Sequence, residues 1–265
     1  MEIKEVSQPA DLQVLEDLFA LVWEVESPPI TADLMRALAH SGNYVVAAVS
    51  DGSIVGAAVA FMGREPDGEV ILHSHIMGVL PVAQTRGTGF DIKQHQRLWA
   101  LNAGIKVVVW TFDPLVRRNA YFNLVKLGAE ATRYKVHFYG DMEGINAGDE
   151  SDRLVIRWRL DSPAAEAAAA GNLSPADLKV LLGEGAAMVL RDDDGEPFAT
   201  DVDAERILCQ VPEDIIAMRS SNPDRALRWR RALRKALSRS LDQGYRIAGF
   251  TRDGWYVLQR GKDGG

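Results

Sequence analysis

The hydrophobic and polar positions of the first 160 residues alternate between helical and strand periods. Apolar side chains at positions 12, 15, 18, 19 and 22 follow the helical repeat and predict a helix over residues 11–23. Residues 44–49 and 54–62 are apolar runs joined by Ser50-Asp51-Gly52, a sequence typical of a hairpin turn. The same reasoning predicts further helices over 30–40, 90–102 and 117–127, and further strands over 69–80, 105–112, 132–138 and 154–160. This order of elements indicates an α+β fold with a mainly antiparallel sheet flanked by helices.

A second pattern begins after an alanine-rich segment. Residues 161–175 are bracketed by prolines and form either a helical spacer or a flexible linker. Beyond them the sequence predicts strands over 187–190, 206–211, 245–250 and 255–258 and a long helix over 223–241, with an acidic turn at 192–197. We therefore expect two domains, 1–160 and a smaller α+β domain over 176–265, joined by the linker 161–175.

The composition is that of an ordinary globular protein, with 47% hydrophobic and 25% charged residues. The net charge of −7 argues against a dedicated nucleic-acid-binding protein, and no segment has the length and apolarity of a membrane span. The lone Cys209 excludes an internal disulfide and a cysteine-built zinc site. We expect a cytoplasmic protein without a metal site.

A glycine-rich segment between an expected strand and an expected helix is the most informative stretch. Gln84-Thr85-Arg86-Gly87-Thr88-Gly89 lets the backbone approach a ligand closely, and the start of the following helix favours anions. The segment has neither the Gly-Lys-Ser/Thr of a nucleotide-binding P-loop nor the GxGxxG spacing of a dinucleotide site. From the two glycines alone, the segment is either an anion-binding loop or a plain turn.

The spacing Val79-x-Pro81-x-x-Gln84-x-x-Gly87-x-Gly89 resembles the signature of the GNAT (GCN5-related N-acetyltransferase) superfamily. The order of elements over about residues 1–160 resembles that family as well. The resemblance implies an acyl-CoA co-substrate, whose pyrophosphate would bind the loop amides and whose pantetheine would bind the strand before the loop. The coenzyme A contacts that it implies are Met77, Gly78, Val79, Gln84, Thr85, Arg86, Gly87, Thr88 and Gly89, with Asn119 and Asn123 on the helix over 117–127.

His73-Ser74-His75 precedes Val79 and supplies a candidate general base. Alternate strand residues point to one face about 6–7 Å apart, so both imidazoles can reach one cleft. Imidazole suits proton removal at neutral pH, although two strand histidines are also common in structural roles. The His-x-His resembles the paired histidines of serotonin N-acetyltransferases, and His73 stands where many GNAT enzymes keep a glutamate base.

The general acid is less clear from the sequence. Many GNAT enzymes carry a tyrosine at the position of Leu124, four residues before Gly128. Tyr121 is the nearest substitute, with a role in either packing or chemistry. Asn119 and Asn123 lie one helical turn apart and face either coenzyme A or solvent.

The helix over 223–241 is rich in arginine, whereas acidic residues far outnumber basic ones in the preceding segment 161–218. The helix therefore pairs with the acids of the same chain, or contacts RNA or an anionic acyl group; internal pairing is the most economical. The final strands resemble the last half of a GNAT unit, which would pack on the catalytic domain or complete a homodimer.

These observations predict an N-acyltransferase that moves an acyl group from acyl-CoA to a small-molecule amine or amino acid. Acetyl is the expected group, with succinyl or another acyl group as alternatives. Direct transfer is expected because Cys209 lies outside the catalytic domain. The alternative function is a non-catalytic acyl-CoA-binding or regulatory module, which the leucine at position 124 keeps open.

Overall fold

The computed structural model describes residues 1–84, 87–140 and 150–261 of the chain. These residues form two compact units: residues 1–110 with 159–162, and residues 111–158 with 163–265. The sequence places the break at 161–175 instead, and the division into domains 1–160 and 176–265 stays a prediction. Each unit is described by itself below.

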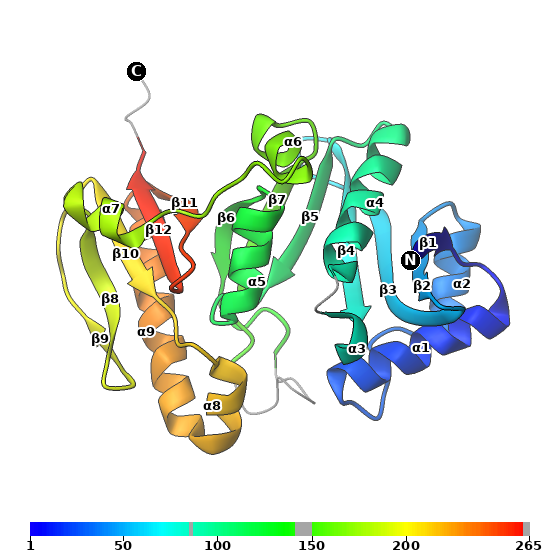
Figure 1. Cartoon of the computed structure of the whole chain (residues 1–265), viewed down its shortest axis with the longest axis horizontal. Coiled ribbons are helices and arrows are strands. Elements are labelled where there is room, and N and C mark those ends of the chain that lie inside the picture. The colour runs from blue at the N-terminus through cyan, green and yellow to red at the C-terminus, as the bar shows by residue number, and fades with distance from the viewer. Residues whose placement is uncertain (85–86, 141–149, 262–265) are drawn as a thin grey trace. The chain divides into compact units, whose positions relative to one another are not determined.

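The first unit is built on a sheet in which three consecutive strands, β2, β3 and β4, pair as hairpins (Figure 1). β1 pairs antiparallel with β2, β2 with β3, and β3 with β4, whereas β5 pairs parallel with β4. The strands are β1 (Glu2–Glu5), β2 (Tyr44–Ser50), β3 (Ser53–Arg64), β4 (Val70–Val79) and β5 (Val107–Phe112). The mixed, mainly antiparallel α+β class expected from the sequence is confirmed.

Helices cover both faces of this sheet. α1 (Pro9–Trp23) and α2 (Ala32–His40) pack on one face, where they share a core with Val45, Ala47 and other residues of β2 and β3. Thr31 caps α2, because its hydroxyl accepts from the amide of Leu34. On the opposite face α4 (Thr88–Asn102) follows the short helix α3 (Pro81–Gln84).

The second unit begins in the middle of β5 and continues through α5 (Arg117–Tyr121) and a π-helical turn over Phe122–Lys126. β6 (Glu130–Lys135) then pairs antiparallel with β7 (Arg153–Arg159). Between the π-helical turn and β6, Gly128 has a φ of 63°, and a Cβ there would lie 2.5 Å from the carbonyl oxygen of Ala164. Only glycine fits this turn, where the start of α6 (Pro163–Ala169) approaches most closely.

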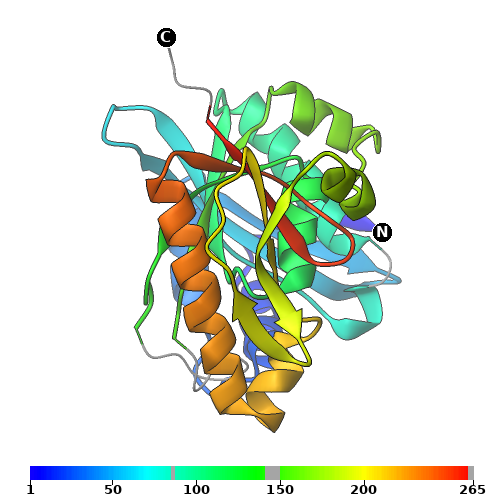
Figure 2. The ribbon, with the colours of Figure 1, turned by 90° about the vertical axis from the view of Figure 1, so that its left-hand side faces the viewer.

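A second sheet with strand order β11-β12-β10-β8-β9 completes this unit. Its strands are β8 (Ala187–Asp193), β9 (Glu196–Ala199), β10 (Arg206–Gln210), β11 (Tyr245–Phe250) and β12 (Trp255–Arg260). α9 (Pro223–Asp242) runs along one face of the sheet in Figure 2. The remaining helices are α7 (Leu178–Gly183) and α8 (Ile215–Ser221).

Several elements differ from the expectation. The alanine-rich segment 161–175 contains a helix, α6, whose Ala165 and Ala168 are buried. The acidic run holds a hairpin as well as a turn, because Asp194 and Gly195 both have positive φ and reverse the chain between β8 and β9. β1, α3, α7 and α8 were not expected, since each is short.

Candidate functional site

The two histidines of β4 lie on one face of the first unit's sheet. Their ring centroids are 6.3 Å apart, which confirms the spacing expected for alternate strand residues. Phe61 of β3 packs beside both, at 5.0 Å from the ring of His73 and 5.8 Å from that of His75. The sheet thus presents two imidazoles on an aromatic support, while their catalytic role stays a prediction.

His75 occupies a β-bulge. The register between β3 and β4 passes from Val59↔Ile76 to Ala60↔Ser74, so His75 is an extra residue without a partner in β3. A bulge bends a strand and redirects its side chains, and such bulges are frequent beside active sites. The ring nitrogens of His73 and His75 form no hydrogen bond with the residues that the structure describes, so both stay available to a ligand.

The surroundings of both imidazoles favour their neutral form. Burial lowers the pKa of His73, and the neighbouring His75 and Lys93 lower it further. Burial also lowers the pKa of His75, which is the more exposed of the two. A neutral imidazole is the form that accepts a proton.

β4 and β5 form a fork. Their parallel pairing consists of Leu72↔Val108 and His73↔Val109, and it ends there, although β4 continues to Val79. Ser74 on β4 and Trp110 on β5 are therefore the first residues beyond the last paired rung. The fork opens directly beside the histidines.

The start of α4 is an uncapped helix N-terminus at the end of β4. Gly87 precedes it with a φ of 82°, and no side chain caps the helix. The amides of Phe90 and Asp91 donate to the carbonyl of Gly87, whereas those of Thr88 and Gly89 donate to no described residue. These two amides, which have no acceptor among the described residues, and the helix dipole make this end of α4 suitable for an anion.

Other residues of this unit that are expected to contact coenzyme A lie around the end of β4. The side-chain amide of Gln84 donates to the carbonyl of Val79 at 2.9 Å, so it ties α3 to the end of β4. Gly78 faces α1, where an added Cβ would lie 3.0 Å from the Trp23 ring. Met77 lies beside Gly89, whose added Cβ would be 3.7 Å from the Met77 methyl carbon. Thr85 and Arg86 lie outside the described residues.

Tyr121, Asn119 and Asn123 belong to the second unit, whereas the two histidines belong to the first. Tyr121 ends α5, and Asn123 is buried in the π-helical turn. Leu124, at the position where the family keeps a tyrosine, is half-buried. The roles of these residues stay predictions.

Asp113 is a buried carboxylate of the second unit. Its two oxygens accept from Arg230 at 2.8 Å each, Arg219 forms a further ion pair with it, and the amide of Leu115 donates to it. The arginines hold the pKa of this carboxyl well below its usual range despite its burial.

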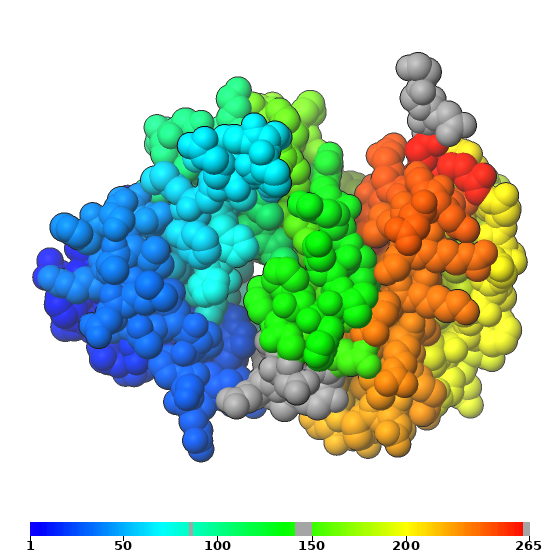
Figure 3. All heavy atoms as spheres, turned by 180° about the vertical axis from the view of Figure 1, so that it is seen from behind, coloured from blue at the N-terminus to red at the C-terminus, as the bar shows by residue number. Residues whose placement is uncertain are grey.

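The arginines of α9 pair within the chain, as expected. Glu196 accepts from Arg225 and Arg228, and Arg239 lies 3.0 Å from Asp201. Glu196 and Asp201 belong to the acidic segment 161–218, whereas Arg234 pairs with Glu150 and Asp152, and Arg230 with Asp113, which lie outside that segment. The outer side of α9 is exposed, as the orange surface in Figure 3 shows.

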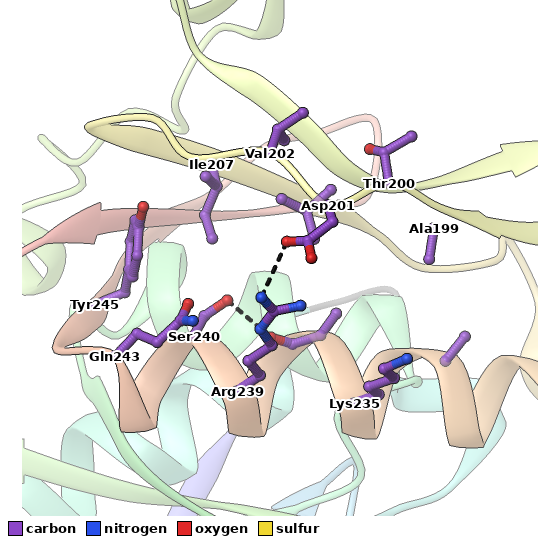
Figure 4. Close-up of a pocket in the computed structure, with 13 residues that line it drawn as sticks. Ala199, Thr200, Asp201, Val202, Ile207, Lys235, Arg239, Ser240, Gln243 and Tyr245 are labelled. Carbon is purple, nitrogen blue, oxygen red and sulfur yellow. Dashed lines mark hydrogen bonds and ion pairs between the residues drawn. The ribbon is translucent and has the colours of Figure 1, made fainter.

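A pocket of about 190 Å³ lies between α9 and the sheet of the second unit (Figure 4). Val189 and Ile207 line it from the sheet, and Lys235 lines it from α9. The Arg239–Asp201 ion pair also belongs to its lining. None of the residues predicted to contact substrate lines this pocket.

Lys93 is the residue of the first unit that sequence reasoning missed. It is buried on the inner face of α4 together with Ile92, Gln96 and Ala100. The signal was present: a lysine at this point of the helical repeat interrupts a stripe that faces the sheet. Its contacts are described below.

No helix in residues 1–84, 87–140 and 150–261 has the length and apolarity needed to cross a membrane. No protein-family model and no curated protein sequence matches the chain. Solved structures do match. Many of these are GNAT acetyltransferases.

One match is Arabidopsis thaliana Naa50 in complex with the bisubstrate analogue CoA-Ac-MVNAL, at 18% identity over 59% of this chain and 96% of that one, with a TM-score of 0.47. Chaetomium thermophilum Naa20 with a bisubstrate analogue matches at 18% identity over 60% and 86%, with a TM-score of 0.49. The GNAT-like decarboxylase GphF with isobutyryl-CoA matches at 19% identity over 60% and 100%, with a TM-score of 0.46.

Proposed function

We propose that this chain is an acyl-CoA-dependent N-acyltransferase that works by direct transfer to an amine. The observation that carries the proposal is the end of β4, where the left-handed Gly87 leads into α4, whose first two amides donate to no described residue. The same residues carry the sequence signature that resembles the GNAT superfamily. An anion such as the pyrophosphate of coenzyme A suits this geometry.

The fork between β4 and β5 supports a place for the thioester. An extended pantetheine can pair with a strand edge that lacks a neighbouring strand. Beyond His73, β4 no longer pairs with β5. A backbone amide of Met77, Gly78 or Val79 would then donate to the thioester carbonyl oxygen as negative charge develops on it.

His73 and His75 would act as general bases. The amine nitrogen attacks the thioester carbon, the bond to sulfur breaks, and a neutral imidazole takes the proton released from the nitrogen. The buried Cys209 belongs to the second unit, and burial raises the pKa of its thiol to about 12, so it is unsuited to a covalent acyl intermediate. Tyr121 is the candidate that would protonate the departing thiolate.

Acetyl is the acyl group that we propose first, and the acceptor is a small amine or an amino acid. The test is thiol release by the full chain from acetyl-, propionyl- and succinyl-CoA in the presence of a panel of amines. We expect amine-dependent release, with a large loss in His73→Ala or His75→Ala. His40→Ala is the matched control, because His40 ends α2 on the protein surface.

The non-catalytic alternative rests on Leu124, which replaces the usual tyrosine of the family. Thermal stabilisation by coenzyme A without release from any donor and amine would favour that alternative. Unchanged turnover in both histidine variants would refute the assignment of the base.

A further inference from the structure

Lys93 places an amine inside the first unit, with neutral groups as its partners. The side chain is 3% exposed. Its Nζ donates to the hydroxyl oxygen of Ser74 at 2.8 Å and to the Oε1 of Gln96 at 3.0 Å. It also lies 3.9 Å from the centre of the Trp110 ring.

These contacts place the amine at the apex of the fork. Ser74 and Trp110 are the first residues of β4 and β5 beyond the last paired rung, and Nζ touches both. Ser74 also stands between His73 and His75 in the chain. The charge of Lys93 therefore acts beside the imidazoles, while its side chain approaches from the face covered by α4.

Stability does not account for a lysine at this position. No carboxylate of the described residues pairs with Lys93, and two hydrogen bonds and an aromatic face replace water incompletely around a buried ammonium. A methionine would fill the same space without that cost. The amide nitrogen of Gln96 is buried as well and has no hydrogen-bond partner among the described residues.

We propose that Lys93 is a positioning residue of the site: from the apex of the fork it takes the first proton that enters, and its charge then keeps His73 neutral. The proposal rests on the proposed acyltransferase function, in which His73 accepts a proton from the amine substrate. His73 serves that role only while its imidazole is unprotonated, so a nearby cation extends its working range to lower pH.

The titratable groups around the apex fit this order of protonation. Burial lowers the pKa of Lys93 to about 7, whereas the pKa of His73 lies below its usual value, partly because of Lys93. The other titratable group that lowers the pKa of His73 is its neighbour His75 on β4. The remaining contacts are with groups that do not titrate: Phe61 of β3 packs against His73, and Trp110 of β5 and Gln96 of α4 contact Lys93. An amine is intrinsically a stronger base than an imidazole, so Lys93 holds a proton in preference to His73.

The test is an NMR titration of the full chain labelled in its histidine rings, with His73 assigned from the spectrum of His73→Gln. In Lys93→Met the midpoint of His73 should rise by about half a pH unit or more, because a unit charge nearby has been removed. In Lys93→Arg, whose charge is permanent, the midpoint should stay at or below that of the original protein. Lys106→Met is the control, since Lys106 is an exposed lysine of the same unit.

Equal midpoints of His73 in the methionine and arginine variants would overturn the proposal. A lysine amine that stays neutral throughout the titration of His73 in the unaltered protein, followed through its 15Nζ signal, would also overturn it, and this measurement holds even where a variant fails to fold. Because neither titration needs substrate, their outcome is independent of the acyl-transfer assay. Loss of acyl transfer with an intact His73 shift would count against the proposed function alone.

Discussion

Replacing Asp113 with asparagine should destabilise the second unit strongly. Arg230 is completely buried, and both of its terminal nitrogens donate to Asp113 at 2.8 Å. Arg219 pairs with the same carboxylate. The substitution would leave two buried guanidinium groups without their shared anion, and removing one partner of a buried ion pair costs about 3–5 kcal/mol.

The companion variant Arg230→Met should cost less, about 2 kcal/mol, because methionine fills part of the space and Asp113 keeps two partners. Those partners are Arg219 and the amide of Leu115. This asymmetry follows from the geometry of the cluster and would not arise from a simple pair.

Urea unfolding at pH 7 measures both changes. At a slope of about 3 kcal/mol per molar urea, the midpoint of Asp113→Asn should fall by about 1–1.7 M. Trp158, Trp229 and Trp255 report on the second unit by fluorescence. Asp161→Asn is the control, because this residue forms an exposed pair with Lys106 and should leave the midpoint unchanged.

The pH dependence has a defined sign. The folded-state pKa of Asp113 is depressed, so its stabilisation is complete above its unfolded pKa of about 3.9 and is lost as pH falls below that value. The difference in free energy of unfolding between the original protein and Asp113→Asn should therefore be constant from pH 5 to 8 and become smaller in acid. A difference below about 1 kcal/mol at pH 7 would refute the reasoning about this cluster.

Three further outcomes are expected. Gly87→Ala should weaken coenzyme A binding several-fold in calorimetry, whereas Gly104→Ala should leave it unchanged. Gly104 is a matched control because both glycines have a positive φ and open space where a Cβ would lie. Equal effects of the two substitutions on binding would contradict a special role for the loop. Cys209 should react with a thiol reagent only at the rate of unfolding, because its buried thiol has a pKa of about 12; fast labelling of the folded protein would contradict this. Gly128→Ala should lower the melting temperature by several degrees, because its Cβ would clash with the backbone of Ala164, and an unchanged melting temperature would show that the turn relaxes freely.

Local patterns accounted for most of the first unit. The helices α1 and α2, the hairpin of β2 and β3, and the passage from β4 to α4 all follow from periodicity, caps and turn residues close together in the chain. The spacing of His73 and His75 was predictable for the same reason, since it depends only on strand geometry.

The remaining features depend on distant contacts or on weak local signals. Asp113 and Arg230 are 117 positions apart, and nothing near either residue indicates the other. β1 and β9 have four residues each, which is too short for a clear alternation of apolar and polar side chains. The acidic residues before β9 favoured the prediction of a turn over that of a hairpin. Lys93 was missed because a lysine in a helix is expected to face water.

The most direct test of the central claim is a coenzyme A titration of the deuterated full chain, followed through its backbone amide resonances. We expect the largest shifts at Thr88 and Gly89, whose amides donate to no described residue, and along Met77–Val79, where β4 no longer pairs with β5. Shifts confined to the pocket beside α9, around Lys235 and Arg239, or no binding at millimolar coenzyme A, would contradict the account.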